Sequence, residues 1–133
     1  MALVVDASTA VAWFIASQAT PYTDRALERA AEGRLHVPPL LYVEFASVLV
    51  KLAHRRKITP DAIGSILDRF EALDLVTDKA PPTARTIAAL CRQHSLSAYD
   101  ATYFELASRL GVPLAAKDAA LARIAKNAGI LLT

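Results

Sequence analysis

The stretch Leu3-Val4-Val5-Asp6-Ala7-Ser8-Thr9 decides how this chain begins to fold. Its first three residues are apolar and rich in β-branched side chains, which predicts a short buried strand. Asp6 and Ser8 are typical of a helix start, because their side chains accept hydrogen bonds from free backbone N–H groups. A carboxylate directly after a buried strand needs a partner, because an unpaired buried charge is very costly. No Lys or Arg occurs in the first twenty residues, so a metal ion is the simplest partner for Asp6.

Strand and helix patterns alternate along the rest of the chain. Further strands are predicted at about 35–37, 75–77, 112–115 and 129–132. Helices are predicted at about 7–16, 22–31, 40–56, 59–73, 83–94, 97–110 and 118–128. This alternation predicts the α/β class, with a central parallel sheet of about five strands covered by helices on both faces.

The composition indicates a single intracellular domain. The 133 residues and their 54% apolar content are enough for one core without disulfide or metal staples. The single cysteine, Cys91, excludes an internal disulfide and fits a reducing cytoplasm. No apolar run reaches the ~20 residues of a membrane span, and the N-terminus lacks the basic region of a signal peptide. The net charge of +2 does not by itself identify a nucleic-acid-binding protein.

Four acidic residues stand at or near predicted helix starts, and they carry most of the functional information. They are Asp6, Glu44, Asp100 and Asp118. In a parallel α/β domain the strand-to-helix turns meet at one edge of the sheet, so acids far apart in sequence meet in space. Clustered carboxylates raise one another's pKa, and a divalent cation relieves this repulsion. Oxygen ligands without Cys or His suit hard cations, which predicts Mg²⁺ or Mn²⁺.

Each acid also has a purely structural interpretation. Helix N-termini favour acids, because free N–H groups and the helix dipole attract negative charge. Ser97 and Asp100 have the spacing of a capping box, and Asp118 is placed to cap the last helix. For Glu44, Asp100 and Asp118, each taken singly, the structural interpretation is favoured. The position of Asp6 after a buried strand shifts the set of four towards a shared functional site.

These residues resemble the PIN domain, and in length and order the chain is similar to a VapC-type toxin ribonuclease. The motifs are Val5-Asp6-Ala7-Ser8, Glu44 after Pro38-Pro39, Ser97-Ala98-Tyr99-Asp100-Ala101-Thr102-Tyr103, and the late Asp118. The resemblance covers essentially the whole chain, 1–133, as one PIN-like nuclease domain. It implies an endoribonuclease whose four acids bind Mg²⁺ or Mn²⁺, with Ser8 helping to order the pocket. It also implies an RNA substrate (a tRNA or rRNA is plausible), a cognate antitoxin and a homodimer.

Two positions depart from the pattern of that family. Ser47 stands where family members often carry Asn, and Ala116 where they often carry Thr or Ser. Polar groups that orient metal ligands are worth about 10–100-fold in affinity or activity. The departures therefore motivate an alternative, a catalytically weak or inactive PIN-like module that binds RNA or protein. A phosphotransfer domain is a third alternative, but it lacks the Asp-x-Asp motif because position 8 is Ser.

Basic and aromatic residues supply the remaining candidates. Lys117 is next to Asp118 and is a candidate for a phosphate contact. A basic cluster ends the long helix, comprising Lys51, His54, Arg55, Arg56 and Lys57, and it is favoured as a dipole-compensating helix end rather than an RNA contact. Trp13 and Phe14 are expected in the core or a dimer contact. Tyr99 and Tyr103 share a helix face. Tyr99 adjoins Asp100, where packing is at least as well supported as a role in shaping the pocket.

Overall fold

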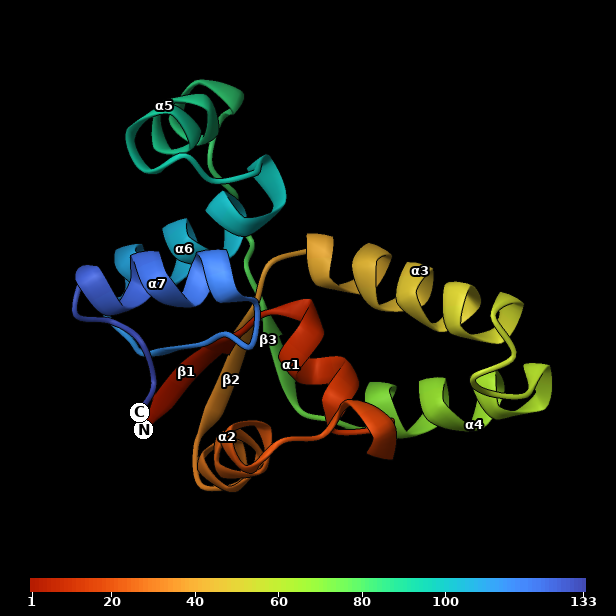
Figure 1. Cartoon of the computed structure of the whole chain (residues 1–133). Coiled ribbons are helices and arrows are strands. Elements are labelled where there is room, and N and C mark those ends of the chain that lie inside the picture. Colours follow the sequence, from red (N-terminus) through yellow and green to blue (C-terminus); the bar gives the residue numbers. More distant parts are fainter.

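The computed structural model describes residues 1–133 and shows a four-stranded parallel sheet with the order β3-β2-β1-β4 (Figure 1). The strands are β1 (Ala2–Val5), β2 (Arg34–Val37), β3 (Leu75–Thr77) and β4 (Leu114–Ala115). The helices are α1 (Ala7–Ala12), the short 3-10 helix η1 (Ala16–Gln18), α2 (Pro21–Ala31), α3 (Leu40–His54), α4 (Pro60–Glu71), α5 (Ala84–His94), α6 (Ala98–Leu110) and α7 (Ala119–Asn127). The predicted α/β class and all-parallel sheet are confirmed.

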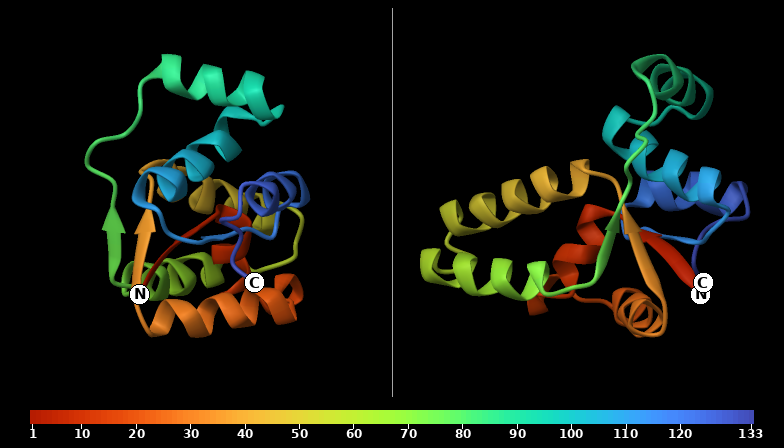
Figure 2. Two further views of the ribbon diagram at one scale, coloured as in Figure 1. Left: turned by 90° about the vertical axis from the view of Figure 1, so that its left-hand side faces the viewer. Right: turned by 180° about the vertical axis from the view of Figure 1, so that it is seen from behind.

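Helices cover both faces of the sheet, and the strand order explains which helix lies on which face. The chain moves from β1 to β2 to β3 in one direction across the sheet and then returns to the far side of β1 as β4. Parallel crossovers are right-handed, so α1–α4 fall on one face and α5 and α6 on the other. Figure 2 shows this division, with α7 beside α6 and with α3 and α4 forming a long hairpin on the opposite side.

The core lies between β1 and the two helical layers. Leu3, Val4 and Val5 are almost fully buried, as expected for an inner strand of a parallel sheet that helices cover on both faces. Aromatic rings join the helices of one layer: Phe45 stacks on Phe70 with ring centroids 3.9 Å apart, and Phe14 meets Phe45 edge-on at 5.7 Å. Phe14 is therefore a core contact, one of the two roles predicted for it.

The predicted fifth strand at 129–132 is reduced to an isolated bridge between Leu114 and Leu131. Leu114 donates to the carbonyl of Ile130 and accepts from the N–H of Leu132, at 2.7 and 2.9 Å. Only Leu114 of the short strand β4 faces this segment, because Pro113 and Ala115 direct their carbonyls to β1, where they accept from Val4 and Asp6. The sheet thus has four strands rather than about five.

The first predicted helix ends earlier than expected, at Ala12 rather than Ala16. The N–H groups of Trp13 and Phe14 bond to carbonyls three residues back, which tightens the last turn. The indole N–H of Trp13 donates to the carbonyl of Thr23 at 2.9 Å and so anchors the break to α2. The long helix predicted at about 40–56 also ends earlier, at His54, because Arg56 adopts a positive φ of 58°.

None of the helices combines the length and the apolar character needed to cross a membrane.

Candidate active site

The carboxyl ends of β1 and β4 form the edge of the sheet at which the acids gather. The chain leaves β1 towards β2 and reaches β4 from β3, so the strand order reverses between β1 and β4. In open α/β sheets, ligands bind outside the strand ends at such a reversal. Asp6 directly follows β1, Asp118 follows β4 after two residues, and the backbone N–H of Asp6 donates to the carbonyl of Ala115 at 3.1 Å.

Asp6 is the most buried of the four acids, with 3% of its surface exposed. It caps α1: its Oδ1 accepts from the backbone N–H of Thr9, and its Oδ2 accepts from the Ser8 hydroxyl, both at 2.9 Å. Burial raises the pKa of the Asp6 carboxyl, and these hydrogen bonds only partly oppose that effect. Asp6 therefore has the predicted structural role of a helix cap, but no basic side chain pairs with its carboxylate.

Glu44 lies in the second turn of α3, half-buried, and points its carboxylate to the same edge. Its Oε1 accepts a 2.7 Å hydrogen bond from the hydroxyl of Tyr103 on α6. Tyr103 is 2% exposed, and burial followed by the neighbouring Glu44 raises the pKa of its phenol far above the ordinary value. The hydroxyl therefore stays protonated and remains a donor.

Asp100 stands in the first turn of α6, which Ser97 caps by accepting from the N–H of Asp100 at 3.1 Å. Burial, and then the charges of Asp118, Asp6 and Glu44, together raise the pKa of the Asp100 carboxyl from 3.8 to about 6. The three acids are thus close enough to Asp100 to oppose its ionisation. This is the carboxylate crowding that the sequence predicts.

Asp118 caps α7, and its Oδ1 accepts from the N–H of Leu121 at 2.9 Å. The turn before it is held by two hydroxyl groups from other parts of the chain. Tyr22 accepts from the N–H of Ala116 at 3.1 Å, and Thr9 accepts from the N–H of Lys117 at 2.9 Å. Both contacts fix the approach of Asp118 to the cavity.

All four acids line one cavity of about 230 Å³. The other lining residues are Ala7, Ser8, Val11, Gln18, Val48 and Tyr103. Acids that lie far apart in the sequence therefore line one cavity. This agrees with the prediction that they meet at one edge of the sheet.

The two polar candidates beside the acids have different positions. Ser8 lines the cavity and donates to Asp6, in keeping with an ordering role. Lys117 does not line it: its ammonium group donates to the backbone carbonyl of Gln18 at 2.7 Å. In this arrangement Lys117 fixes the end of η1, and its charge is not directed at the acids.

The donor set of the cavity suits a hard divalent cation. Both ion pairs in the structure belong to Arg109, so none of the four cavity acids pairs with a basic side chain. No group of three or more His, Cys, Asp or Glu side chains is already drawn together in a metal-binding geometry. Four carboxylates and no His or Cys in the lining match the ligand preference of Mg²⁺ and Mn²⁺.

The two departures from the family pattern lie at the margin of the site. Ser47 is exposed and does not line the cavity, where the next residue, Val48, does. Ala116 is 3% exposed, and its N–H is satisfied by Tyr22. Ala116 has no hydroxyl of its own to order this turn. The hydroxyls of Tyr22 and Thr9 hold the turn instead, through the N–H groups of Ala116 and Lys117.

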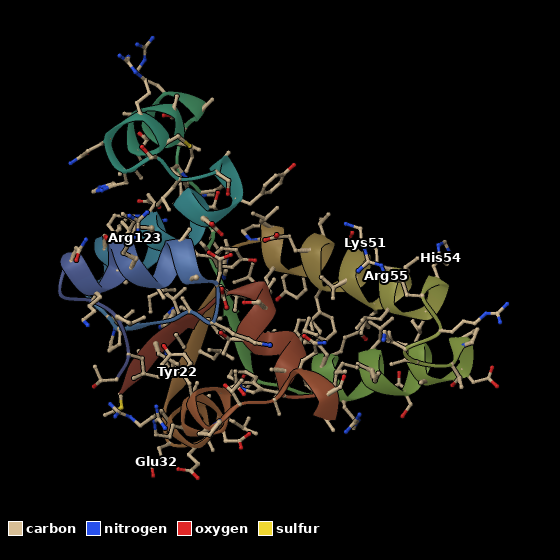
Figure 3. All side chains as sticks on the ribbon, in the orientation of Figure 1. Tyr22, Glu32, Lys51, His54, Arg55 and Arg123 are labelled. Atoms are coloured by element: carbon tan, nitrogen blue, oxygen red, sulfur yellow. The ribbon has the colours of Figure 1, made fainter.

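The basic cluster lies away from the cavity. Figure 3 shows Lys51, His54 and Arg55 at the C-terminal end of α3. Glu44 is the fifth residue of α3, near the opposite end. The cluster caps the C-terminal end of α3, where cations are favoured by the helix dipole.

Sequence reasoning missed Tyr103, Thr9 and Tyr22 as partners of the site. The only signal was the place of Tyr103 three residues after Asp100, which puts both on one face of α6. Thr9 and Tyr22 carry no motif, since they reach the site through backbone N–H groups near Asp118.

Comparison with known proteins agrees with this fold. The sequence model of the PIN domain matches residues 3–127. The chain is 32% identical over 126 residues to a protein named Ribonuclease VapC3 from Pyrobaculum aerophilum, covering 92% of this chain and 93% of the relative. The crystal structure of PAE2754 from Pyrobaculum aerophilum superposes with a TM-score of 0.72 at 20% identity, over 92% of this chain and 84% of that one. The chain belongs to the PIN domain family.

Proposed function

We propose that this protein is a metal-dependent endoribonuclease that acts as the toxin of a toxin–antitoxin pair. The observation that carries the proposal is the set of four carboxylates, Asp6, Glu44, Asp100 and Asp118, around one cavity at the sheet edge. Membership of the PIN domain family and the likeness to a protein named Ribonuclease VapC3 support the same activity.

The carboxylates have a direct chemical role in this proposal. They would hold Mg²⁺ or Mn²⁺ through oxygen ligands, and Ser8 would keep Asp6 in place through its hydrogen bond. When bound, such a cation supplies Lewis-acid activation of water and neutralises charge on a phosphodiester. The chain itself orients the carboxylates, and it keeps them on the rigid ends of β1, α3, α6 and α7.

The proposal includes the partners and the setting of the reaction. The substrate is RNA, with a tRNA or an rRNA as plausible targets, and a cognate antitoxin holds the toxin inactive. Residues 1–133 act as one nuclease domain, which works as a homodimer in the cytoplasm. Hydrolysis at the phosphorus by water would leave 5′-phosphates and would not require the RNA 2′-hydroxyl as nucleophile.

A PIN-like module that binds RNA or protein without turnover is the second candidate. Ser47 and Ala116 favour it, because two polar side chains common in the family are missing beside the ligands. The four acids and the hydroxyl contacts of Tyr22 and Thr9 support catalysis instead. Turnover measured with and without metal separates the two candidates.

The test is cleavage of total cellular RNA by the purified protein with Mn²⁺, with EDTA, and with the variant Asp100→Asn. A matched control is Asp61→Asn, which changes an exposed first-turn acid of α4 that does not line the cavity. Discrete 5′-phosphorylated fragments are expected from the wild type and from Asp61→Asn in Mn²⁺ only. Bound but intact RNA in every lane would favour the binding module.

A further inference from the structure

We propose that Tyr103 is a positioning residue that holds the Glu44 carboxylate in the orientation needed to bind the metal ion. The inference rests on the proposed metal-dependent function and assigns it a residue outside the four acids. Tyr103 lines the same cavity as the acids, and its hydroxyl donates to Glu44 Oε1 at 2.7 Å. This hydrogen bond joins α6 to α3 across 59 positions of sequence.

The need for Tyr103 follows from the place of Glu44 in its helix. Asp6 and Asp118 are helix caps, so a backbone N–H, of Thr9 or of Leu121, holds one oxygen of each carboxylate. Glu44 lies inside α3, where the backbone N–H groups bond to carbonyls of the preceding turn and are not available. The Tyr103 hydroxyl therefore does for Glu44 what a helix N-terminus does for the two aspartates.

Tyr103 is well suited to this role because its own position is fixed. Its residue surface is 2% exposed, and its neighbours Phe104, Leu106 and Ala107 on α6 are buried in the same core. A packed phenol ring has few accessible rotamers, so the position of its hydroxyl oxygen is set by the core. The glutamate has more rotatable bonds than an aspartate and gains more from such a constraint.

One oxygen of Glu44 is engaged by this hydrogen bond, and the other remains for a cation. The alternative is that Tyr103 simply packs in the core and Glu44 satisfies its hydroxyl. The two interpretations differ in metal affinity. A positioning role makes Mn²⁺ binding depend on the hydroxyl, whereas a packing role leaves it unchanged when the ring is kept.

The test measures Mn²⁺ binding by calorimetry for the wild type, Tyr103→Phe and Tyr99→Phe. Tyr99 lies one turn earlier on α6 and is 60% exposed, so its substitution controls for the loss of a phenol hydroxyl. Tyr103→Phe is expected to weaken Mn²⁺ binding by about 10–100-fold, as is usual when a group that orients a metal ligand is lost. Tyr99→Phe is expected to have no effect.

Glu44→Ala, alone and combined with Tyr103→Phe, shows whether the effect passes through Glu44. If it does, Tyr103→Phe adds nothing once the Glu44 carboxylate is absent. An equal loss of affinity in both backgrounds, or unchanged binding by Tyr103→Phe, would overturn the inference. Thermal unfolding of the metal-free variants checks that the fold is retained.

Proton NMR of the metal-free protein tests the hydrogen bond even if Tyr103→Phe does not fold. A slowly exchanging hydroxyl resonance is expected for Tyr103 in the wild type and is expected to disappear in Glu44→Ala. Its absence from the wild type would overturn the inference. Failure of the wild type to bind Mn²⁺ would overturn the proposed metal-dependent function as well. A hydroxyl resonance observed in that case would show that the hydrogen bond exists although the cavity does not bind the metal.

Discussion

Asp100→Asn is expected to make the metal-free protein more stable near neutral pH, although it removes a first-turn acid of α6. Burial, and then the charges of Asp118, Asp6 and Glu44, raise the pKa of Asp100 from 3.8 to about 6. The folded state therefore binds a proton more tightly than the unfolded state. Ionisation of Asp100 costs nothing in stability below about pH 3.8, and its cost grows until about pH 6 and is complete above it.

The size of the effect follows from the same pKa values. The difference between 3.8 and about 6 corresponds to about 3 kcal/mol at full strength. Because Asp100 is only half-buried, solvent screening reduces this to about 1–2 kcal/mol. Loss of the favourable charge at the helix N-terminus removes about 0.3–0.5 kcal/mol of the gain. A net stabilisation of about 1 kcal/mol raises the Tm of a domain of this size by about 3–5 °C.

The assay is urea or thermal unfolding of both proteins in EDTA, near pH 7.5 and again near pH 3.5. The gain is expected at the higher pH and should vanish at the lower one, where the wild-type carboxyl is protonated in both states. Added Mn²⁺ should reverse the order, because tighter binding stabilises the wild type more. A less stable variant near pH 7.5, or the same difference at both pH values, would refute the electrostatic argument.

Substitutions at three further positions test the local structure and, at Asp118, its separation from metal binding. Asp118→Ala removes the cap on the N–H of Leu121 and should cost about 1 kcal/mol in urea unfolding, whereas Asp118→Asn should keep most of that stability but lose Mn²⁺ affinity in calorimetry. Equal stability of the two variants would contradict the cap. Thr9→Val leaves the N–H of Lys117 without its acceptor and should cost about 1–3 kcal/mol. Thr9→Ser keeps the acceptor and should lose only about 0.5–1.5 kcal/mol, the contribution of a buried methyl group. A Thr9→Val protein as stable as the wild type would exclude this role. Gly64→Ala should raise stability by about 0.5–1 kcal/mol, because glycine is unfavourable inside a helix and an added Cβ at this position of α4 meets no other atom. A lower Tm would contradict the open space around position 64.

The fold and the positions of the acids follow from signals that are local in the sequence. Apolar runs mark the strands, and Asp6 and Asp118 mark helix starts because capping depends on groups within three residues. The gathering of the acids at one edge then follows from parallel topology alone. The strands and helix starts depend on residues close together in the chain, so they can be predicted from the sequence.

The remaining details depend on contacts between distant segments. The first helix stops at Ala12 without a glycine or proline, because Trp13 reaches the carbonyl of Thr23 on the next helix. The ammonium group of Lys117 finds the carbonyl of Gln18, which no spacing rule indicates. The bond between Tyr103 and Glu44 is of the same kind, since no periodicity connects positions on two different helices.

The strand order also bears on the synthesis of the protein. β1 is translated well before its neighbour β4 and the last of the four acids, Asp118. At ~5–20 residues per second, roughly 5–25 seconds separate the translation of Asp6 from that of Asp118. During that interval the nascent chain has one open edge on its central strand and an incomplete set of carboxylates. In terms of the proposed function, the four carboxylates can form a complete metal site only after Asp118 has been translated, so the chain lacks that site beside cellular RNA until then.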